Sequence, residues 1–202
     1  SLRRLYLVRH GQTEFNVRRA VQGQCDSPLT PLGRAQAHDA ALWLSDHGVV
    51  PDRMVSSPLG RAMSTAAIIA CGLGFDGNVE AEPGIIERAY GSFEGGPFDE
   101  LPCDVWNPGD TLVPFGGEGD EAVRDRMTRA LASDICADGV STLLAVSHGS
   151  ASRQFVATTL APGETVPERL PNCAVMAFSF DESARSFSLE GIFDPARGRV
   201  RT

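Results

Sequence analysis

Four short segments contain most of the side chains of this chain that could do chemistry. They are LVRHGQTEFN (7–16), SSPLGRAMSTA (56–66), IIERAYGSFEG (85–95) and AVSHGSASR (145–153). Between them they supply two arginines, two histidines and a glutamate, namely Arg9, Arg61, His10, His148 and Glu87. An arginine presents a planar fork of donors that binds phosphate oxygens in pairs, and it stays charged. A neutral imidazole is a nucleophile toward phosphorus. This set of residue types therefore indicates phosphoryl transfer.

The remaining two groups fit the same chemistry. A second histidine can donate a hydrogen bond to a phosphoryl oxygen as negative charge builds on it. A glutamate on a mobile loop can protonate a leaving oxygen and then activate a water molecule. None of these steps requires a metal ion, and the chain contains neither an H-E-x-x-H motif nor a D-x-D pair. We expect no metal and no cofactor.

The elements that must position these residues alternate between short apolar runs and helical stretches. Strands are expected at 5–9, 54–57 and 143–147, with closing strands at 174–180 and 187–193. Helices are expected at 30–48, 60–71 and 118–135, and from Gly149 to about Leu160. This order predicts an α/β fold, a three-layer sandwich with a mainly parallel sheet and helices on both faces. Ligands bind at the carboxyl ends of such strands, where three of the four segments begin.

Two regions depart from this alternation. Residues 91–119 contain seven glycines and four prolines, which indicates a long irregular excursion, and excursions of that length are usually functional lids. The tail from Pro195, with Arg197, Arg199 and Arg201, is expected to be a solvated end and not a binding arm. We expect residues 1–202 to form a single domain with the lid inserted at about 91–119.

Composition excludes several classes of protein. All 18 basic residues are arginines, so a lysine Schiff base and the lysine of a P-loop are ruled out. The net charge of −8 argues against nucleic-acid and membrane-surface partners. Five scattered cysteines without a C-x-x-C pair, and no long apolar stretch, indicate a cytoplasmic protein with reduced thiols. The expected partner is a small phosphate ester, and a homodimer stays an open alternative.

The same four segments, in the same order, resemble the signature segments of the histidine phosphatase superfamily, in its phosphoglycerate-mutase-like branch. The segment VQGQCDSPLTPLGRAQA (21–37) also resembles the stretch that follows the first family motif. The resemblance implies His10 as the phosphorylated nucleophile and Glu87 as the proton donor. It implies a phosphate pocket formed by Arg9, Arg61 and His148. Contacts to the phosphate or the substrate are expected from Asn16, Gln22, Gly23 and Gly149.

Alternatives remain at several positions. Glu94 and Glu118 lie in the predicted lid, into which Glu87 leads, and either could serve as the acid instead. Ser56 and Ser57 are not framed by G-x-S-x-G, so we interpret them as a helix entry. His47 with Gly48 imitates the His-Gly motif but is interpreted as a helix stop.

A phosphatase is the predicted activity, and the alternatives are a phosphoglycerate mutase and a non-catalytic phosphoester-binding protein. The family's mutases carry a histidine where Ala89 stands and a lysine further on, and this chain has no lysine. The substrate is not specified by the sequence. The lid side chains Trp106, Phe98 and Phe115 are expected to select it, with Glu118 near the mouth disfavouring heavily anionic partners.

Overall fold

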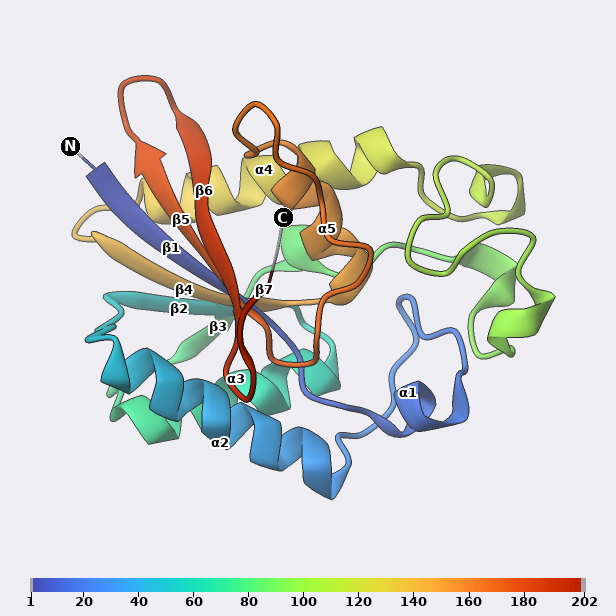
Figure 1. Ribbon diagram of the computed structural model, residues 1–202, viewed down its shortest axis with the longest axis horizontal. Helices are drawn as coiled ribbons and strands as arrows, with labels where there is room; N and C mark the ends of the chain where they lie inside the picture. The colour runs from blue at the N-terminus through green and yellow to red at the C-terminus, as the bar shows by residue number, and fades with distance from the viewer. Residues whose placement is uncertain (1, 201–202) are drawn as a thin grey trace.

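The computed structural model describes residues 2–200, and within this range one seven-stranded sheet carries helices on both faces (Figure 1). The strands are β1 (Leu2–Arg9), β2 (Arg53–Ser56), β3 (Val79–Ala81), β4 (Thr142–Ser147), β5 (Val175–Asp181), β6 (Ser186–Asp194) and β7 (Gly198–Val200). The helices are α1 (Glu14–Arg18), α2 (Pro31–Asp46), α3 (Gly60–Leu73), α4 (Asp120–Ile135) and α5 (Gly149–Ala157).

The sheet has a parallel half and an antiparallel half. Its order is β3-β2-β4-β1-β5-β6-β7; the first four of these strands pair in parallel, and each later pairing is antiparallel. The predicted α/β class and the helices on both faces are confirmed. The parallel arrangement holds for the half of the sheet whose strands are joined by helices, whereas β5, β6 and β7 follow one another through tight turns.

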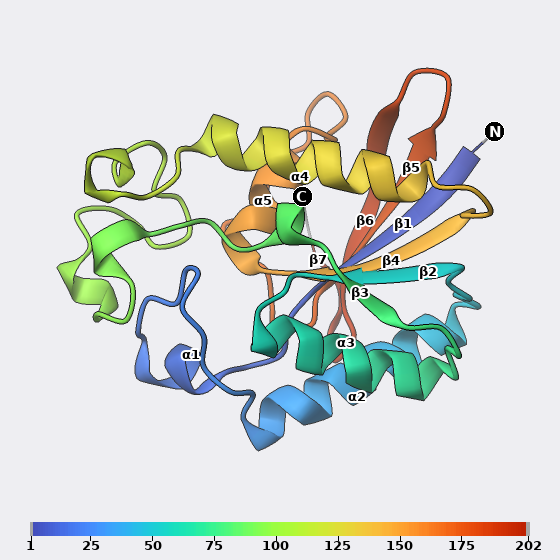
Figure 2. The same cartoon turned by 180° about the vertical axis from the view of Figure 1, so that it is seen from behind.

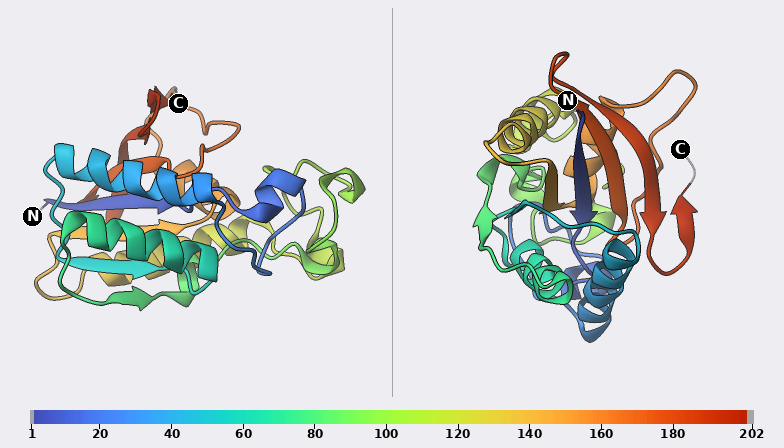
Figure 3. Two further views of the ribbon diagram at one scale, coloured as in Figure 1. Left: turned by 90° about the horizontal axis from the view of Figure 1, so that it is seen from below. Right: turned by 90° about the vertical axis from the view of Figure 1, so that its left-hand side faces the viewer.

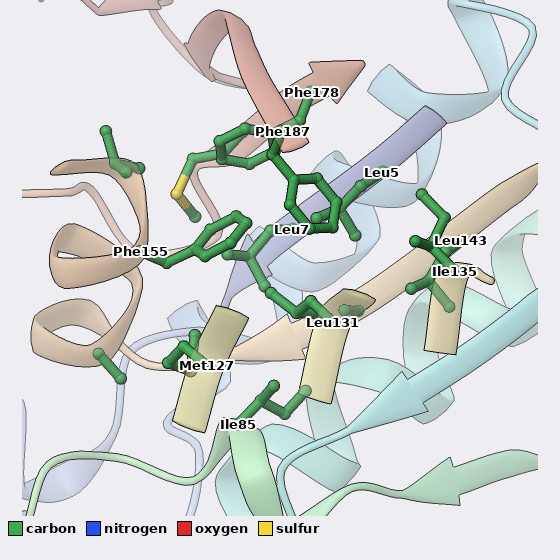
Figure 4. Packing of buried hydrophobic residues seen from close by; sticks show 14 of the residues in the cluster. Leu5, Leu7, Ile85, Met127, Leu131, Ile135, Leu143, Phe155, Phe178 and Phe187 are labelled. Carbon is green, nitrogen blue, oxygen red and sulfur yellow. The ribbon is translucent and has the colours of Figure 1, made fainter. Parts of the chain in front are cut away.

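Helices cover both faces of the sheet (Figure 2), and the side chains of the central strands alternate between two hydrophobic cores. Leu5 and Leu7 of β1 face α4 and α5, where they pack with Met127, Leu131 and Phe155 (Figure 4). The opposite face packs on α2 and α3 through Val8, Leu144, Val146, Ala37, Leu44, Ala66 and Ile69. A strand covered on both faces has a nearly continuous apolar run, and such runs allowed β1 and β4 to be predicted from the sequence.

The helix α2 begins and ends where its sequence signals predict. Thr30 is the N-cap, and its side chain accepts a hydrogen bond from the backbone N–H of Gly33. Pro31 occupies the first turn, where its missing N–H is not needed. Gly48 follows the helix with a φ of +68°, a left-handed conformation that favours glycine. The interpretation of His47 and Gly48 as a helix stop is confirmed.

The predicted irregular segment 91–119 lies beyond the carboxyl ends of the strands, beside α1 (Figure 3, left). It has no α-helix or strand and contains three single turns of 3₁₀ helix, at Gly91–Phe93, Phe98–Glu100 and Val113–Phe115. A small separate apolar cluster holds it together. Its members are Val21, Tyr90 and Leu112, with Phe93, Phe98, Leu101, Cys103 and Val105 packed around them.

The tail from Pro195 is exposed at residues 196–199, as a solvated end should be, but it has a regular structure. Gly198–Val200 forms the strand β7, which pairs with β6. Arg199 donates to the backbone carbonyl of Glu190 and lies over the ring of Phe193. Arg197 lines the large cavity described below. Arg201 lies outside the described residues.

Candidate active site

The carboxyl ends of the parallel strands bring the predicted site residues to one rim. Arg9 ends β1, His10 follows it, and His148 follows β4 in the neighbouring strand position. The two imidazole rings lie 5.2 Å apart, centroid to centroid, at 60°. Arg61, in the first turn of α3, enters the same rim from the end of β2. Arg9, His10 and Arg61 line a cavity of about 740 Å³ together with Glu87, whereas His148 is buried beside His10 and is not part of the lining.

His10 is held as a neutral imidazole with a free Nε2. Its Nδ1 lies 2.7 Å from the carbonyl oxygen of Gly11. A carbonyl can only accept, so Nδ1 carries the proton and Nε2 carries the lone pair. Burial, followed by the charges of Arg61 and Arg9, lowers the pKa of His10 well below its usual value. The imidazole is therefore uncharged at neutral pH, and its Nε2 has the free lone pair that a nucleophile needs.

His148 carries its proton on Nδ1 as well, but here Nδ1 is the nitrogen left free, because Ser57 bonds Nε2. Nε2 of His148 lies 2.7 Å from the Ser57 hydroxyl, which also accepts from the backbone N–H of Leu59. Among the described residues the hydroxyl proton has no other acceptor, so it is donated to Nε2 and Nδ1 keeps its own proton. Burial, then the charges of Arg61, His10 and Arg9, lowers the pKa of His148. Its Nδ1 is buried without a partner in residues 2–200.

The two arginines are each fixed on one side and free at Nε. Arg9 donates from Nη1 to the carbonyl of Leu170 at 2.6 Å. Arg61 donates to the carbonyls of Cys25 and Gly23, both at 2.6 Å, and pairs with Asp26 at 3.0 Å. In both, the buried Nε has no partner within the described part of the chain. Burial lowers the pKa of Arg9 to about 10, so it remains charged at neutral pH.

Glu87 lines the cavity from the N-terminal end of α5. Its Oε1 accepts from the backbone N–H groups of Arg88, at 2.7 Å, and Ala151, at 2.8 Å. Its Oε2 accepts from the backbone N–H of Ser150 at 3.2 Å. These bonds fix the carboxyl group in orientation at the wall of the cavity.

The two alternative acids are engaged elsewhere. Glu94 accepts from the backbone N–H groups of Gln24, Cys25 and Tyr90, and Glu118 pairs with Arg126 at 2.9 Å. Neither lines the cavity. The expectation that Glu118 lies near the mouth is therefore wrong. Its carboxylate instead joins Arg126 of α4 to the backbone N–H of Ala89.

The four expected contact residues all line the cavity. Asn16 closes the capping box of α1, and Gln22 accepts from Thr13 and Ser27, so their oxygens already have donors. Gly23 has a φ of +55°, and a Cβ there would lie 2.7 Å from the Glu94 side chain. Glycine is needed at position 149 for a similar reason, because a Cβ there would lie 2.6 Å from the ring of Trp106.

Comparison with known proteins identifies the family. The model of the histidine phosphatase superfamily (branch 1) matches residues 5–192. The chain belongs to this superfamily. Probable phosphoglycerate mutase GpmB of Yersinia pestis (strain Pestoides F) is 36% identical over 191 residues, which cover 89% of this chain and 86% of the relative. The chain is thus an enzyme of the histidine phosphatase type.

Solved structures agree with this placement. A mycobacterial glucosyl-3-phosphoglycerate phosphatase, in complex with VO3, has a TM-score of 0.77 and 27% identity, covering 93% of this chain and 97% of its own. A mutant of the phosphoserine phosphatase of Entamoeba histolytica, in complex with phosphoserine, has a TM-score of 0.73 and 27% identity, covering 94% of this chain and 95% of its own.

Two residues of this histidine phosphatase site, Ser57 and Asn172, were not predicted as site residues, and Trp106 was predicted only as a lid side chain that selects the substrate. Ser57 was interpreted as a helix entry, yet its hydroxyl bonds His148. Asn172 donates to the backbone carbonyl of His10 at 3.2 Å, and Trp106 lies over the Arg9 guanidinium at 4.7 Å. No sequence signal links these residues to the motifs, since the links are made by tertiary contacts alone.

The part of the chain that the structure describes holds no cluster of three His, Cys, Asp or Glu side chains able to bind a metal ion. None of the described helices combines the length and apolar character needed to cross a bilayer.

Proposed function

We propose that this histidine phosphatase hydrolyses small phosphate monoesters without a metal ion, through a phosphohistidine on His10. One observation carries the proposal: the unprotonated Nε2 of His10 shares a buried rim with three N–H groups that have no partner in residues 2–200. Those groups are Nε of Arg9, Nε of Arg61 and Nδ1 of His148. Buried donors without acceptors are rare, and an anionic phosphoryl group would satisfy all three.

In the first step, Nε2 of His10 forms a bond to phosphorus while the bond from phosphorus to the ester oxygen breaks. The departing alkoxide takes a proton from Glu87, which becomes a carboxylate. Arg9, Arg61 and His148 donate to the equatorial oxygens, where charge accumulates. The bond from Nδ1 to the Gly11 carbonyl spreads the positive charge that develops on the ring.

In the second step, a water oxygen attacks phosphorus and gives a proton to Glu87. The bond from phosphorus to Nε2 breaks, and its electron pair returns to the imidazole. Inorganic phosphate leaves, and Glu87 is again protonated for the next ester. The two steps balance without an oxidant, a reductant or a metal-bound hydroxide.

A phosphoglycerate mutase is the second candidate, favoured by the similarity to a probable mutase. A mutase must return the phosphoryl group to its substrate and exclude water. The absence of lysine from the chain removes the family's usual lysine contact from that task. We therefore favour hydrolysis.

The test uses p-nitrophenyl phosphate and 3-phosphoglycerate after exhaustive chelation. We expect release of inorganic phosphate from both, and acid-labile phosphate trapped on His10 and lost in His10→Ala. A loss of activity beyond about tenfold that added metal restores would contradict metal independence. Formation of 2-phosphoglycerate faster than phosphate would establish the mutase.

A further inference from the structure

Beyond the phosphate pocket, two arginines stand at the lid end of the cavity. Arg19 and Arg169 line the cavity of about 740 Å³ and also a side pocket of about 190 Å³. Phe98, Val105 and Trp106 line both spaces as well, so the two arginines lie where the spaces meet. Trp106 connects this place to the chemistry, since its ring also covers Arg9.

Both guanidinium groups are unpaired within the described part of the chain. In residues 2–200 neither lies within 4.0 Å of a carboxylate, unlike the seven arginines that form ion pairs, and neither donates a hydrogen bond. The side pocket does contain Asp99 and Asp104. Asp104 accepts from the backbone N–H of Trp106, and these two carboxylates do not line the main cavity. The lining of the main cavity therefore includes two unpaired positive charges at this end.

The chain holds both arginines in place. Arg19 has a φ of +55°, a left-handed conformation that costs a non-glycine residue about 1 kcal/mol and is common at functional sites. Its carbonyl accepts from Phe98 at 3.0 Å, and its guanidinium lies 5.2 Å from the Phe98 ring centre. Arg169 is presented by a fixed loop, because Arg153 binds the carbonyl of Pro167 and Arg9 binds that of Leu170.

Another part of the cavity lining has a different balance of charge. Arg197 lines it together with the carboxylates of Asp39 and Asp194. The lid end is thus the part of the leaving-group space with unbalanced positive charge.

We propose that Arg19 and Arg169 form a second anion subsite, so that the preferred substrates are phosphate monoesters whose alcohol carries another anionic group, a carboxylate or a second phosphate. This inference rests on the proposed phosphatase function and names its substrate class. Specificity arises because an ester without that group leaves both guanidinium groups without an acceptor. The subsite is partly exposed, so we expect each arginine to contribute roughly tenfold, less at high salt.

The test compares esters that differ only in the second group: 3-phosphoglycerate against glycerol 3-phosphate, and fructose 1,6-bisphosphate against fructose 6-phosphate. The first pair reports a carboxylate and the second a phosphate. Wild type should prefer the member with the additional anionic group in at least one pair, by about tenfold or more in kcat/KM. Arg19→Ala and Arg169→Ala should each remove most of that preference by raising KM for the preferred ester only.

Arg18→Ala is the matched control, because Arg18 is adjacent, pairs with Glu14 at 3.6 Å and does not line the cavity. It should leave the preference unchanged. Equal kcat/KM within both pairs, or equal KM increases for both members of a pair, would overturn the subsite while leaving the phosphatase intact. If no ester is hydrolysed, calorimetric binding to His10→Ala still decides: the subsite requires tighter binding of the preferred ester, lost in the double variant that also carries Arg19→Ala.

Discussion

At the scale of single residues, the chemistry depends on which nitrogen of each histidine carries a proton. His10 and His148 both carry their proton on Nδ1 but present different nitrogens to the rim, because a neighbour at 2.7 Å holds Nδ1 of His10 and Nε2 of His148. Gly11 makes one ring a nucleophile, and Ser57 makes the other a donor. Burial and two arginines keep both rings neutral, so neither role requires a titration near neutral pH.

Replacing Ser57 by Ala should lower kcat by about 10²-fold, the usual loss for one donor to a transition-state oxygen. Without the hydroxyl, Nε2 of His148 can carry the proton, and Nδ1 then has none to donate. Phosphohistidine should still form on His10, only more slowly, in a single-turnover measurement. Ser56→Ala is the control, since Ser56 is equally buried and bonds only the carbonyl of Ser57. Equal losses in both variants would show a general packing effect.

Replacing Glu87 by Gln should separate esters by their leaving groups. An alkoxide needs a proton to depart, whereas nitrophenolate leaves nearly unaided. The first step should therefore slow by about 10²- to 10⁴-fold for an alkyl phosphate and much less for p-nitrophenyl phosphate. Breakdown of the intermediate also uses Glu87, so the comparison requires rapid-quench measurement of the first turnover. If both esters slow equally in that step, Glu87 is not the acid that protonates the leaving group.

At the scale of elements, the irregular segment is anchored to the site by one aromatic side chain. Trp106 lies over Arg9 and against the first residue of α5, and its carbonyl accepts from the buried Arg153 at 2.6 Å. The close approach requires glycine at 149. The segment 91–119 is thereby tied both to the phosphate pocket and to the helix that carries it.

Gly149→Ala should displace the lid without destabilising the helix. The added Cβ would lie 2.6 Å and 2.7 Å from two atoms of the Trp106 ring, while alanine has the higher helix propensity at a helical position. We expect kcat/KM to fall by about tenfold or more, with little change in Tm. The change should cost much less in a Trp106→Leu background, which a double-mutant cycle measures. Additive losses would mean that the Cβ acts on Arg9, 3.1 Å away, and not through the lid.

Most elements, the four-residue strand β2 among them, could be predicted from the sequence, and three short ones could not. β1, β4 and α2 could be predicted because apolar runs and helix caps are local sequence signals. α1, β3 and β7 have five, three and three residues, so their formation depends on neighbours that a local pattern does not contain. The same division holds in the site. His10, Arg9 and His148 follow strands, whereas Ser57, Trp106 and Asn172 reach them only through tertiary contacts.

At the scale of the whole molecule, local and global charge have opposite signs. The chain carries a net charge of −8, while the cavity is lined by Arg9, Arg19, Arg61, Arg169 and Arg197 against three carboxylates. An anionic ester is therefore bound by the local field of the cavity in spite of the global one. Because short-range and buried charges are screened less than distant ones, this selectivity belongs to the cavity and not to steering over the surface.

The two buried histidines also couple the chemistry to stability. Their folded pKa values lie below the unfolded value of about 6.5, so only the unfolded chain takes up these protons as the pH falls. The free energy of unfolding should therefore decrease below pH 6.5, by up to about 1.4 kcal/mol per pH unit for each histidine. Asp134 acts in the opposite direction, because burial raises its pKa to about 6 and the folded state takes up its proton first.

Urea unfolding of wild type and of the His10→Gln, His148→Gln double variant, between pH 7.5 and 5, tests this coupling. Asp134 is common to both proteins, so its contribution cancels in the difference between the two curves. We expect the stability of wild type relative to the variant to fall as the pH decreases through 6.5, since the variant has no histidine to protonate at these positions. A pH-independent difference would mean that both rings titrate alike in the folded and unfolded chains. The neutral nucleophile deduced from the Gly11 contact would then have no thermodynamic support.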